Sequence, residues 1–305
     1  MRGSPKIEGI PEIAYVCPPV GEHIFARRAA RLRSLAPGHP LGDYLAATAW
    51  LADAQQAAWD AIPVVSNEKP LTGEFPFHSV EWRRDDTWRL MLKTILSKME
   101  KAPLPPPART ALGHLCTSSP AELDTYADAL LAGEYARIEL ASAPCLGAAL
   151  QVYWTALAGA IEAPGEPRSR LECPVCAFPP VAGVLRPDSK LRYLVCGLCN
   201  TEWYLPRLTC SNCGSTESLS YLSIENDSDG TKAECCARCH AYLKLFYPEA
   251  SPAAEPFADD VATLALDILV SEEGFSRAGP NFYLLPGTSE KALVFPERDS
   301  PRLVQ

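Results

Sequence analysis

The sequence predicts an all-α domain followed by two small β modules, each built around four cysteines, and then a C-terminal helix. Eight of the twelve cysteines form four Cys-x-x-Cys pairs between residues 173 and 239. The chain before these pairs shows the apolar spacing of amphipathic helices, and one more helical pattern follows them. These observations divide the chain into four parts, namely residues 1–165, 171–208, 209–250 and 251–305.

Composition narrows the class of protein. The chain has 305 residues, 47% of them hydrophobic, and a net charge of −9. No apolar run approaches the roughly 20 residues of a membrane span, and the N-terminus lacks the apolar core of an export signal. We therefore expect a cytoplasmic protein without membrane insertion. The acidic balance, with no basic excess in residues 171–247, argues against a nucleic-acid partner.

The N-terminal region begins with a proline-rich segment, residues 1–20, which predicts an extended arm. Apolar periodicity and capping signals then predict six helices, the last apolar on all sides and so expected to be buried. Residues 63–84 predict a long loop available to a partner, and residues 163–170 a linker. The helices are expected at residues 22–36, 41–62, 85–100, 108–116, 120–132 and 144–161.

Four arginines lie close together in the first predicted helix. Ile24, Ala29, Leu32 and Leu35 share its apolar side, and the arginines fall mostly elsewhere. Two interpretations are open: a solvated face, or a docking patch for an acidic surface. The four residues are Arg27, Arg28, Arg31 and Arg33.

Each Cys-x-x-Cys turn directs two sulfurs at one point, and two such turns together make a tetrahedral four-sulfur cage that suits zinc or iron. The residues between the pairs indicate which pairs combine. VAGVLR-PDSK-LRYLVC and SYLSIE-NDSDG-TKAECC each predict two strands around a turn, and a hairpin brings its two ends together. The predicted ligands are Cys173, Cys176, Cys196 and Cys199 for the first site, and Cys210, Cys213, Cys236 and Cys239 for the second.

Other pairings and other uses of these eight cysteines are less well supported by the sequence. A cross-brace of alternate pairs is possible, but the hairpins disfavour it. Disulfides require an oxidising compartment, and free redox dithiols are expected in a βαβ context that is absent here. Because each ribbon is too small for a core of its own, a metal ion should contribute on the order of 10 kcal/mol to its folding. The residue types leave iron and zinc both open.

Four cysteines and one histidine lie outside these pairs. Cys17, Cys116 and Cys145 are expected to be small buried or half-buried residues. Cys235 has no partner three residues on, unlike its neighbour Cys236, and is expected to be a bystander. His240 follows Cys239 directly, but a fifth ligand is unnecessary.

A last helix is predicted over residues 257–273, ended by Gly274. Asp259 and Asp260 lie in its first turn, where they either cap the helix or face a partner. The segment after it lacks periodicity. The expected inner stripe is Val261, Leu264, Ala265, Ile268 and Leu269.

Several long stretches resemble the bacterial formate dehydrogenase accessory proteins of the FdhE type. They include ECPVC, LRYLVCGLCNTEWYLPRLTCSNCG, CCARCHAYLKLFY and FADDVATLALDILVSEEGFSRAGPN, and the likeness extends upstream to FARRAARLRSLAPGHPLGDYLAATAWLADAQQAA. The resemblance implies an α-helical domain with two tandem rubredoxin-like ribbons and favours iron as the metal. Two features depart from the family pattern. Ala177 stands where glycine is common, and Cys235 adds a cysteine.

The resemblance also implies a function. Proteins of this family are cytoplasmic maturation factors that bind the catalytic subunit of molybdenum-containing formate dehydrogenase before its twin-arginine export. No nucleophile–base pair, phosphate loop or paired carboxylates stand out in the sequence, so we expect no enzyme. A rubredoxin-like electron-transfer or sulfur-handling role is the alternative, and a nucleic-acid-binding ribbon is the least favoured.

Overall fold

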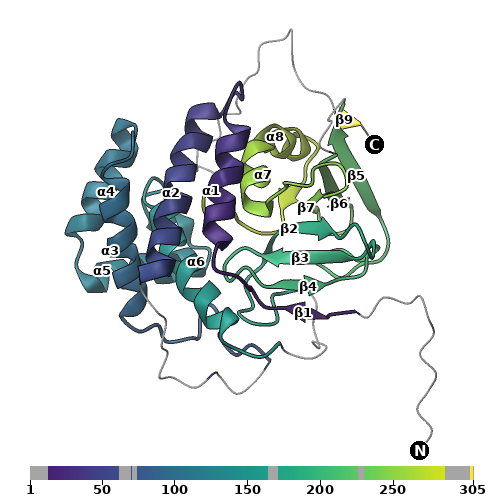
Figure 1. The fold of residues 1–305 in the computed structure, drawn as a ribbon. Coiled ribbons are helices and arrows are strands. Elements are labelled where there is room, and N and C mark those ends of the chain that lie inside the picture. Colours follow the sequence, from purple (N-terminus) through teal and green to yellow (C-terminus); the bar gives the residue numbers. More distant parts are fainter. Residues whose placement is uncertain are drawn as a thin grey trace, which may run out of the picture.

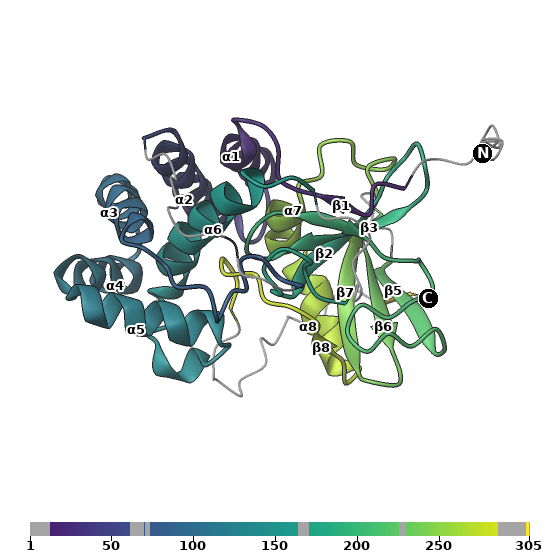
Figure 2. The same ribbon diagram turned by 90° about the horizontal axis from the view of Figure 1, so that it is seen from below.

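The computed structural model describes residues 13–61, 70, 74–163, 171–225, 230–285 and 303–304. Helices form one half of the molecule and a twisted sheet the other, as Figure 1 shows. Two C-terminal helices, α7 (Pro256–Ala262) and α8 (Leu264–Glu272), lie between these halves, and Figure 2 shows the same arrangement from below. The fold predicted from the sequence is confirmed in class, because helices precede two small β modules that carry the cysteine groups.

All six helices predicted in the N-terminal region are present, and their ends fall within two residues of the expected positions. The fifth begins with a capping box, in which Ser119 and Glu122 each accept a hydrogen bond from the other's backbone N–H. The helices are α1 Ile24–Leu35, α2 Gly42–Ala61, α3 Thr87–Met99, α4 Pro106–Thr117, α5 Pro120–Leu131 and α6 Ala143–Gly159.

Helix α6 lies at the centre of the helical half and is buried along almost its whole length, as predicted from its all-round apolar character. The C-terminal segment of the chain packs against one position on this helix, Gly147. A Cβ atom at Gly147 would lie only 2.4 Å from the Cβ of Phe282. Glycine is therefore needed here, and it lets Phe282 and Tyr283, with 0% and 1% of their surfaces exposed, pack into the helical core.

The two predicted hairpins are confirmed, and each is extended by a third antiparallel strand. One sheet contains both ribbons, in the strand order β1-β4-β3-β2-β7-β6-β5-β9, with β8 beside β7. The strands are β1 Val16–Cys17, β2 Pro180–Leu185, β3 Arg192–Cys196, β4 Glu202–Tyr204, β5 Leu219–Ile224, β6 Lys232–Cys236, β7 Ala241–Phe246, β8 Ser276–Arg277 and β9 Leu303–Val304.

A parallel pairing between β2 and β7 joins the two ribbons. Gly183 lies opposite Leu245 in this pair, and a Cβ atom at position 183 would come within 2.6 Å of the Leu245 Cδ2 atom. The missing side chain therefore leaves the space in which Leu245 packs. The ribbons are tandem in sequence but share one sheet in space.

The predicted helix over residues 257–273 is two helices, α7 Pro256–Ala262 and α8 Leu264–Glu272, which meet at Thr263. The break changes the helical phase, so the predicted inner stripe is correct only at its first member. Val261 is buried, whereas the other four members of the stripe are half-buried. Helix α8 instead buries Leu266, Asp267 and Val270.

Neither interpretation of the arginines in α1 is correct for all four. Arg27 and Arg33 are exposed, but Arg28 has 0% of its surface exposed and its guanidinium stacks 3.7 Å from the ring centroid of Phe257. Arg31 forms an ion pair with Asp259. The helix does dock on acidic groups, and those groups belong to the same chain.

The aspartates of α7 also pair internally. Asp259 accepts a hydrogen bond from the backbone N–H of Glu255 over 2.8 Å, which satisfies part of the helix start as expected, in addition to its pair with Arg31. Asp260 is fully buried and pairs with Lys244 at 2.9 Å and Arg277 at 2.7 Å. Of the two interpretations, capping therefore holds for Asp259, and the alternative that this pair faces a partner is excluded.

Candidate metal centres

The first four-cysteine group is gathered by the β2–β3 hairpin. Cys173 and Cys176 lie in the turn before β2, and Cys196 and Cys199 lie at the end of β3 and in the turn after it. Sγ–Sγ distances are 3.5 Å between Cys173 and Cys199 and 3.4 Å between Cys176 and Cys196. All four residues have 0% of their surface exposed.

The second group repeats this design with β5 and β6. The Sγ atoms of Cys210 and Cys239 are 3.7 Å apart, and those of Cys213 and Cys236 are 3.8 Å apart. In both groups all four sulfurs lie within 4.8 Å of one another. Sequential pairing of the Cys-x-x-Cys motifs is therefore confirmed, and the cross-brace is excluded.

The four turns share one backbone conformation. The residue that follows the second cysteine of each pair has a positive φ angle near the left-handed helical value. In the first turn the backbone N–H of Ala177 donates to the Cys173 carbonyl oxygen over 2.8 Å, and in the last His240 donates to Cys236 over 2.9 Å. The angles are 57° at Ala177, 59° at Asn200, 70° at Gly214 and 54° at His240.

The sulfur positions fit a bound metal ion better than they fit disulfide bonds. A disulfide requires sulfurs about 2.05 Å apart, far closer than in either group. A tetrahedral ion with bonds of about 2.3 Å separates its sulfurs by roughly 3.8 Å. The spacings in both groups are close to that value. Each group can therefore hold one metal ion.

The surroundings of the sulfurs favour a cation as well. Burial raises the pKa of the Cys176 and Cys196 thiols well above the ordinary value, because a thiolate loses its hydration there. At Cys199 burial also acts to raise the pKa, but hydrogen bonds with the other three cysteines and Thr201 outweigh it and lower the pKa. Four thiolates can then coexist only beside a positive charge. Two backbone N–H groups, those of Leu198 and Cys199, already point at the Cys196 sulfur from 3.3 Å. In the second group burial raises the pKa of Cys210 to about 12.

Two helices of the helical half, α1 and α6, hold the first group in place. The Gln151 side chain on α6 donates to the Gly197 carbonyl oxygen over 2.9 Å. Asn200 donates to the hydroxyl of Thr155 over 2.7 Å and accepts from Arg28 over 2.8 Å. These contacts place the turn of Cys196 and Cys199 directly against α1 and α6.

A loop segment secures the other turn of the same group. The backbone N–H of Phe77 donates to the Val175 carbonyl oxygen over 2.9 Å, and that of Ser79 donates to Cys176 over 2.7 Å. The indole of Trp154 in turn donates to the Phe77 carbonyl oxygen over 2.9 Å. The described part of the loop predicted over residues 63–84 therefore contacts the first ribbon. Residues 62–69 and 71–73 lie outside the described residues.

The second group lies nearer the surface. Cys213 and Cys239 are half-buried, and their neighbours Asn212, Arg238 and His240 are exposed. Hydrogen bonds to the Cys239 sulfur outweigh its partial burial and lower the pKa of this thiol to about 7. The two centres are thus chemically alike but differ in access to solvent.

The remaining candidates lie outside both groups. Cys235 is buried, and its thiol points back toward the Ala233 carbonyl oxygen at 3.7 Å, as expected of a bystander. His240 is exposed and lies beside the Phe275 ring. Cys17 is half-buried and Cys145 buried as expected, but Cys116 is exposed, so its prediction is wrong.

Sequence reasoning missed the polar residues that hold the first group, namely Arg28, Gln151, Thr155 and Asn200. One signal was present for Asn200, because asparagine tolerates a positive φ angle better than most residues and follows a Cys-x-x-Cys turn. No local pattern marks the other three.

A helical half joined to a sheet with two four-cysteine groups defines a protein of zinc-ribbon type in which each group can hold a metal ion. Comparison with known proteins gives the particular family. The chain belongs to the FdhE family, because models of the FdhE N-terminal, central and C-terminal domains match residues 13–169, 172–207 and 208–284.

Relatives and a solved structure agree with this assignment. The chain is 38% identical over 285 residues to a protein named FdhE homolog from Cronobacter sakazakii and to FdhE from Salmonella paratyphi A, covering 88% of this chain and 90% of each relative. The crystal structure of the FdhE protein from Pseudomonas aeruginosa is similar with a TM-score of 0.82 at 37% identity. It covers 91% of this chain and 100% of that chain.

Among the described residues, none of the helices is both long and apolar enough to cross a membrane.

Proposed function

We propose that this chain is a formate dehydrogenase accessory factor that binds the catalytic subunit in the cytoplasm, before that subunit is exported. The proposal joins membership of the FdhE family to the role implied by the sequence resemblance. In this role the protein does not turn over a substrate. It recognises an immature client and holds it.

The observation that best supports a binding role is the position of the first cysteine group. It lies where the helices contact the sheet. All four cysteines of that group are fully buried, and hydrogen bonds from Gln151, Ser79 and Arg28 reach its two turns. A metal ion held by Cys173, Cys176, Cys196 and Cys199 would supply the charge that makes four buried thiolates stable. These residues would thereby keep the two halves in one fixed arrangement.

We propose that all eight cysteines of the two groups are ligands and that iron is the metal, with zinc as the alternative. The support for iron is the rubredoxin-like character implied by the family resemblance. Elemental analysis of the purified protein should give two metal ions per chain. Iron would colour the protein red through charge-transfer absorption, whereas a colourless protein with two zinc ions would reject iron.

The binding role is tested by co-purification. The wild-type chain and a Cys210→Ser/Cys213→Ser variant are tagged and used to capture the catalytic subunit of molybdenum-containing formate dehydrogenase from a cell extract. Capture by the variant should fall at least tenfold, because the second group then lacks two of its four proposed metal ligands. The matched control is Cys116→Ser, at an exposed cysteine outside both groups, which should capture as the wild type does. Equal capture by all three proteins would reject metal-held recognition.

A second candidate function is electron transfer or sulfur handling during maturation. The half-buried Cys213 and Cys239 favour it, since electrons or sulfur can reach the second group from solvent. Reversible reduction of the metal-loaded protein at a physiological potential would support this function, and a redox-silent protein that still supports maturation would exclude it.

A further inference from the structure

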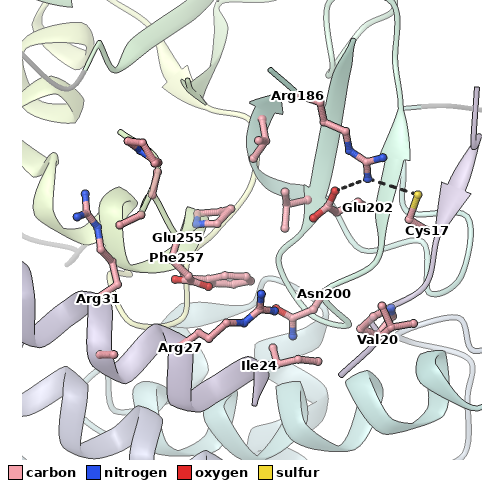
Figure 3. Close-up of a pocket in the computed structure, with 18 of the residues that line it drawn as sticks. Cys17, Val20, Ile24, Arg27, Arg31, Arg186, Asn200, Glu202, Glu255 and Phe257 are labelled. Carbon is pink, nitrogen blue, oxygen red and sulfur yellow. Dashed lines mark hydrogen bonds and ion pairs between the residues drawn. The ribbon is translucent and has the colours of Figure 1, made fainter. Parts of the chain in front are cut away.

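A cavity of about 740 Å³ lies between α1, the outer part of the first ribbon and the segment that leads into α7 (Figure 3). This volume is within the range of ligand pockets. Its apolar lining comes from all three walls, with Ile24 on α1, Val184 on β2 and Phe257 on α7. Val20 also lines it while 82% of its surface is exposed, so the apolar surface continues outward over the rim.

Most charged groups around the cavity are neutralised within the protein. Arg186 pairs with Glu202 over 2.8 Å on the ribbon wall, next to Cys17, as the dashed lines in Figure 3 show. The other two pairs are Arg31 with Asp259 and Glu255 with Arg28.

Arg27 is different. Its side chain is exposed, and it forms no ion pair with any other residue in the described part of the chain. Figure 3 shows it extending across the cavity toward Asn200. The cavity therefore carries one uncompensated positive charge, although the chain as a whole has a net charge of −9. An apolar pocket with a single free guanidinium complements a carboxylate attached to an apolar group.

We propose that this cavity binds an extended segment of the client protein in which an aspartate or glutamate lies beside apolar side chains. The inference rests on the proposed function, which supplies a protein client. The carboxylate pairs with Arg27, and the apolar side chains pack on Ile24, Phe257 and Val20. The exposed apolar rim at Val20 suits a chain that runs on beyond the cavity better than a small molecule enclosed by it.

The cavity is held open before any ligand arrives. Asn200 lines the cavity, and its hydrogen bonds with Arg28 and Thr155 hold it in place. Because Asn200 directly follows Cys199, the first cysteine group helps to shape this wall. Such pre-organisation lowers the entropic cost of binding.

Two substitutions in the full-length protein test the cavity. Ala30→Trp fills it from an exposed position on α1, and Arg27→Glu reverses its free charge. The matched controls are Ala121→Trp and Arg109→Glu, at exposed positions on α5 and α4 that do not line the cavity. Circular dichroism and metal content check that all four variants fold as the wild type does.

Each cavity variant should capture less than one tenth of the catalytic subunit that the wild type captures, and each control should match the wild type. If the wild type captures the subunit and the cavity variants do so equally well, the cavity proposal is wrong and the proposed function stands. Failure of the wild type to capture the subunit would reject the proposed function together with the cavity proposal.

Peptides provide a direct readout of the chemistry. Overlapping fluorescein-labelled peptides from the catalytic subunit are titrated with the wild-type chain and followed by fluorescence anisotropy. Those that bind should carry an acidic residue next to apolar ones, and replacing that acid by its amide should weaken binding about tenfold. Unchanged binding of the amide peptide, or selection of peptides without an acidic residue, would overturn the proposal.

Discussion

Arg28 and Asn200 lie 172 positions apart in the chain, yet the Arg28 Nη2 atom donates a hydrogen bond to the Asn200 Oδ1 atom over 2.8 Å. Arg28 belongs to the first helix, and Asn200 directly follows the last cysteine of the first group. A fully buried guanidinium therefore depends on a turn that the cysteines shape. The helical half and the first candidate metal centre are linked through this contact.

Replacement of Asn200 by alanine should destabilise the protein by about 2 to 3 kcal/mol. It removes the hydrogen bonds to Arg28 and Thr155 and places alanine at a φ angle of 59°. Chemical denaturation of the metal-loaded protein measures the effect. The control is His240→Ala, at the equivalent position of the last turn (φ 54°), where the side chain is exposed. That variant should lose only about 1 kcal/mol, and equal losses in the two variants would contradict the link.

Replacement of Ala177 by glycine should stabilise the protein by about 0.5 to 1 kcal/mol, because alanine is strained at a φ angle of 57° and glycine is not. The reverse change, Gly214→Ala, tests the same position in the third turn. A Cβ atom there would meet only ordinary contacts with Leu171, so the backbone alone should cost about 1 kcal/mol. A shift in unfolding midpoint of the same sign in both variants would count against this account.

The two metal ions should leave at different rates. Exposure of the metal-loaded protein to an excess of chelator should release one equivalent at least tenfold faster than the other, as followed by elemental analysis of the remaining protein. The fast equivalent belongs to the second group, because Cys213 and Cys239 are half-buried, whereas the first group is fully buried. A Cys210→Ser/Cys213→Ser variant should lack the fast phase. Release of both ions at one rate would show that burial does not control access.

Asp260 should make stability depend on pH. Burial alone would raise its pKa, but the positive charges of Arg277 and Lys244 outweigh burial and lower it. Its contribution is therefore complete above the ordinary carboxyl value of 3.8 and is lost as pH falls through the lowered value. At about pH 7, Asp260→Asn should be less stable than the wild type by about 3 kcal/mol.

Thermal unfolding of the two proteins between about pH 7 and about pH 3 checks this expectation. The difference should shrink as the pH falls below the ordinary carboxyl value. Acid also protonates the cysteine groups, but both proteins carry the same groups, so that effect cancels in the comparison. A difference that does not change with pH would mean that the ionised form of Asp260 contributes nothing.

The cysteine groups and the hairpins were predictable because their determinants are local. Each Cys-x-x-Cys turn and each strand–turn–strand pattern lies within one ribbon, and a hairpin fixes which ends meet. Helices α1 to α6 were predictable for the same reason, since apolar periodicity and caps are read within one segment.

The contacts between the segments were not predictable. β2 and β7 pair in parallel although a whole ribbon separates them in the sequence, and no residue pattern marks that choice. Arg28 resembles the exposed Arg27 beside it, and its burial is tolerable because acceptors from four other segments meet its guanidinium, namely Gln151, Asn200, Glu255 and Tyr283. The break at Thr263 was also hidden, because the apolar spacing in the sequence continues past it.

Phe282 packs against Gly147, and this contact sets an order of events during synthesis. When α6 leaves the ribosome, Phe282, whose ring packs over Gly147, has not yet been made. The space beside Gly147 stays open until Phe282 has emerged. The core beside Gly147 therefore stays incomplete while residues 160–281 are synthesised, and a chain truncated before Phe282 keeps a permanent gap that proteases can attack.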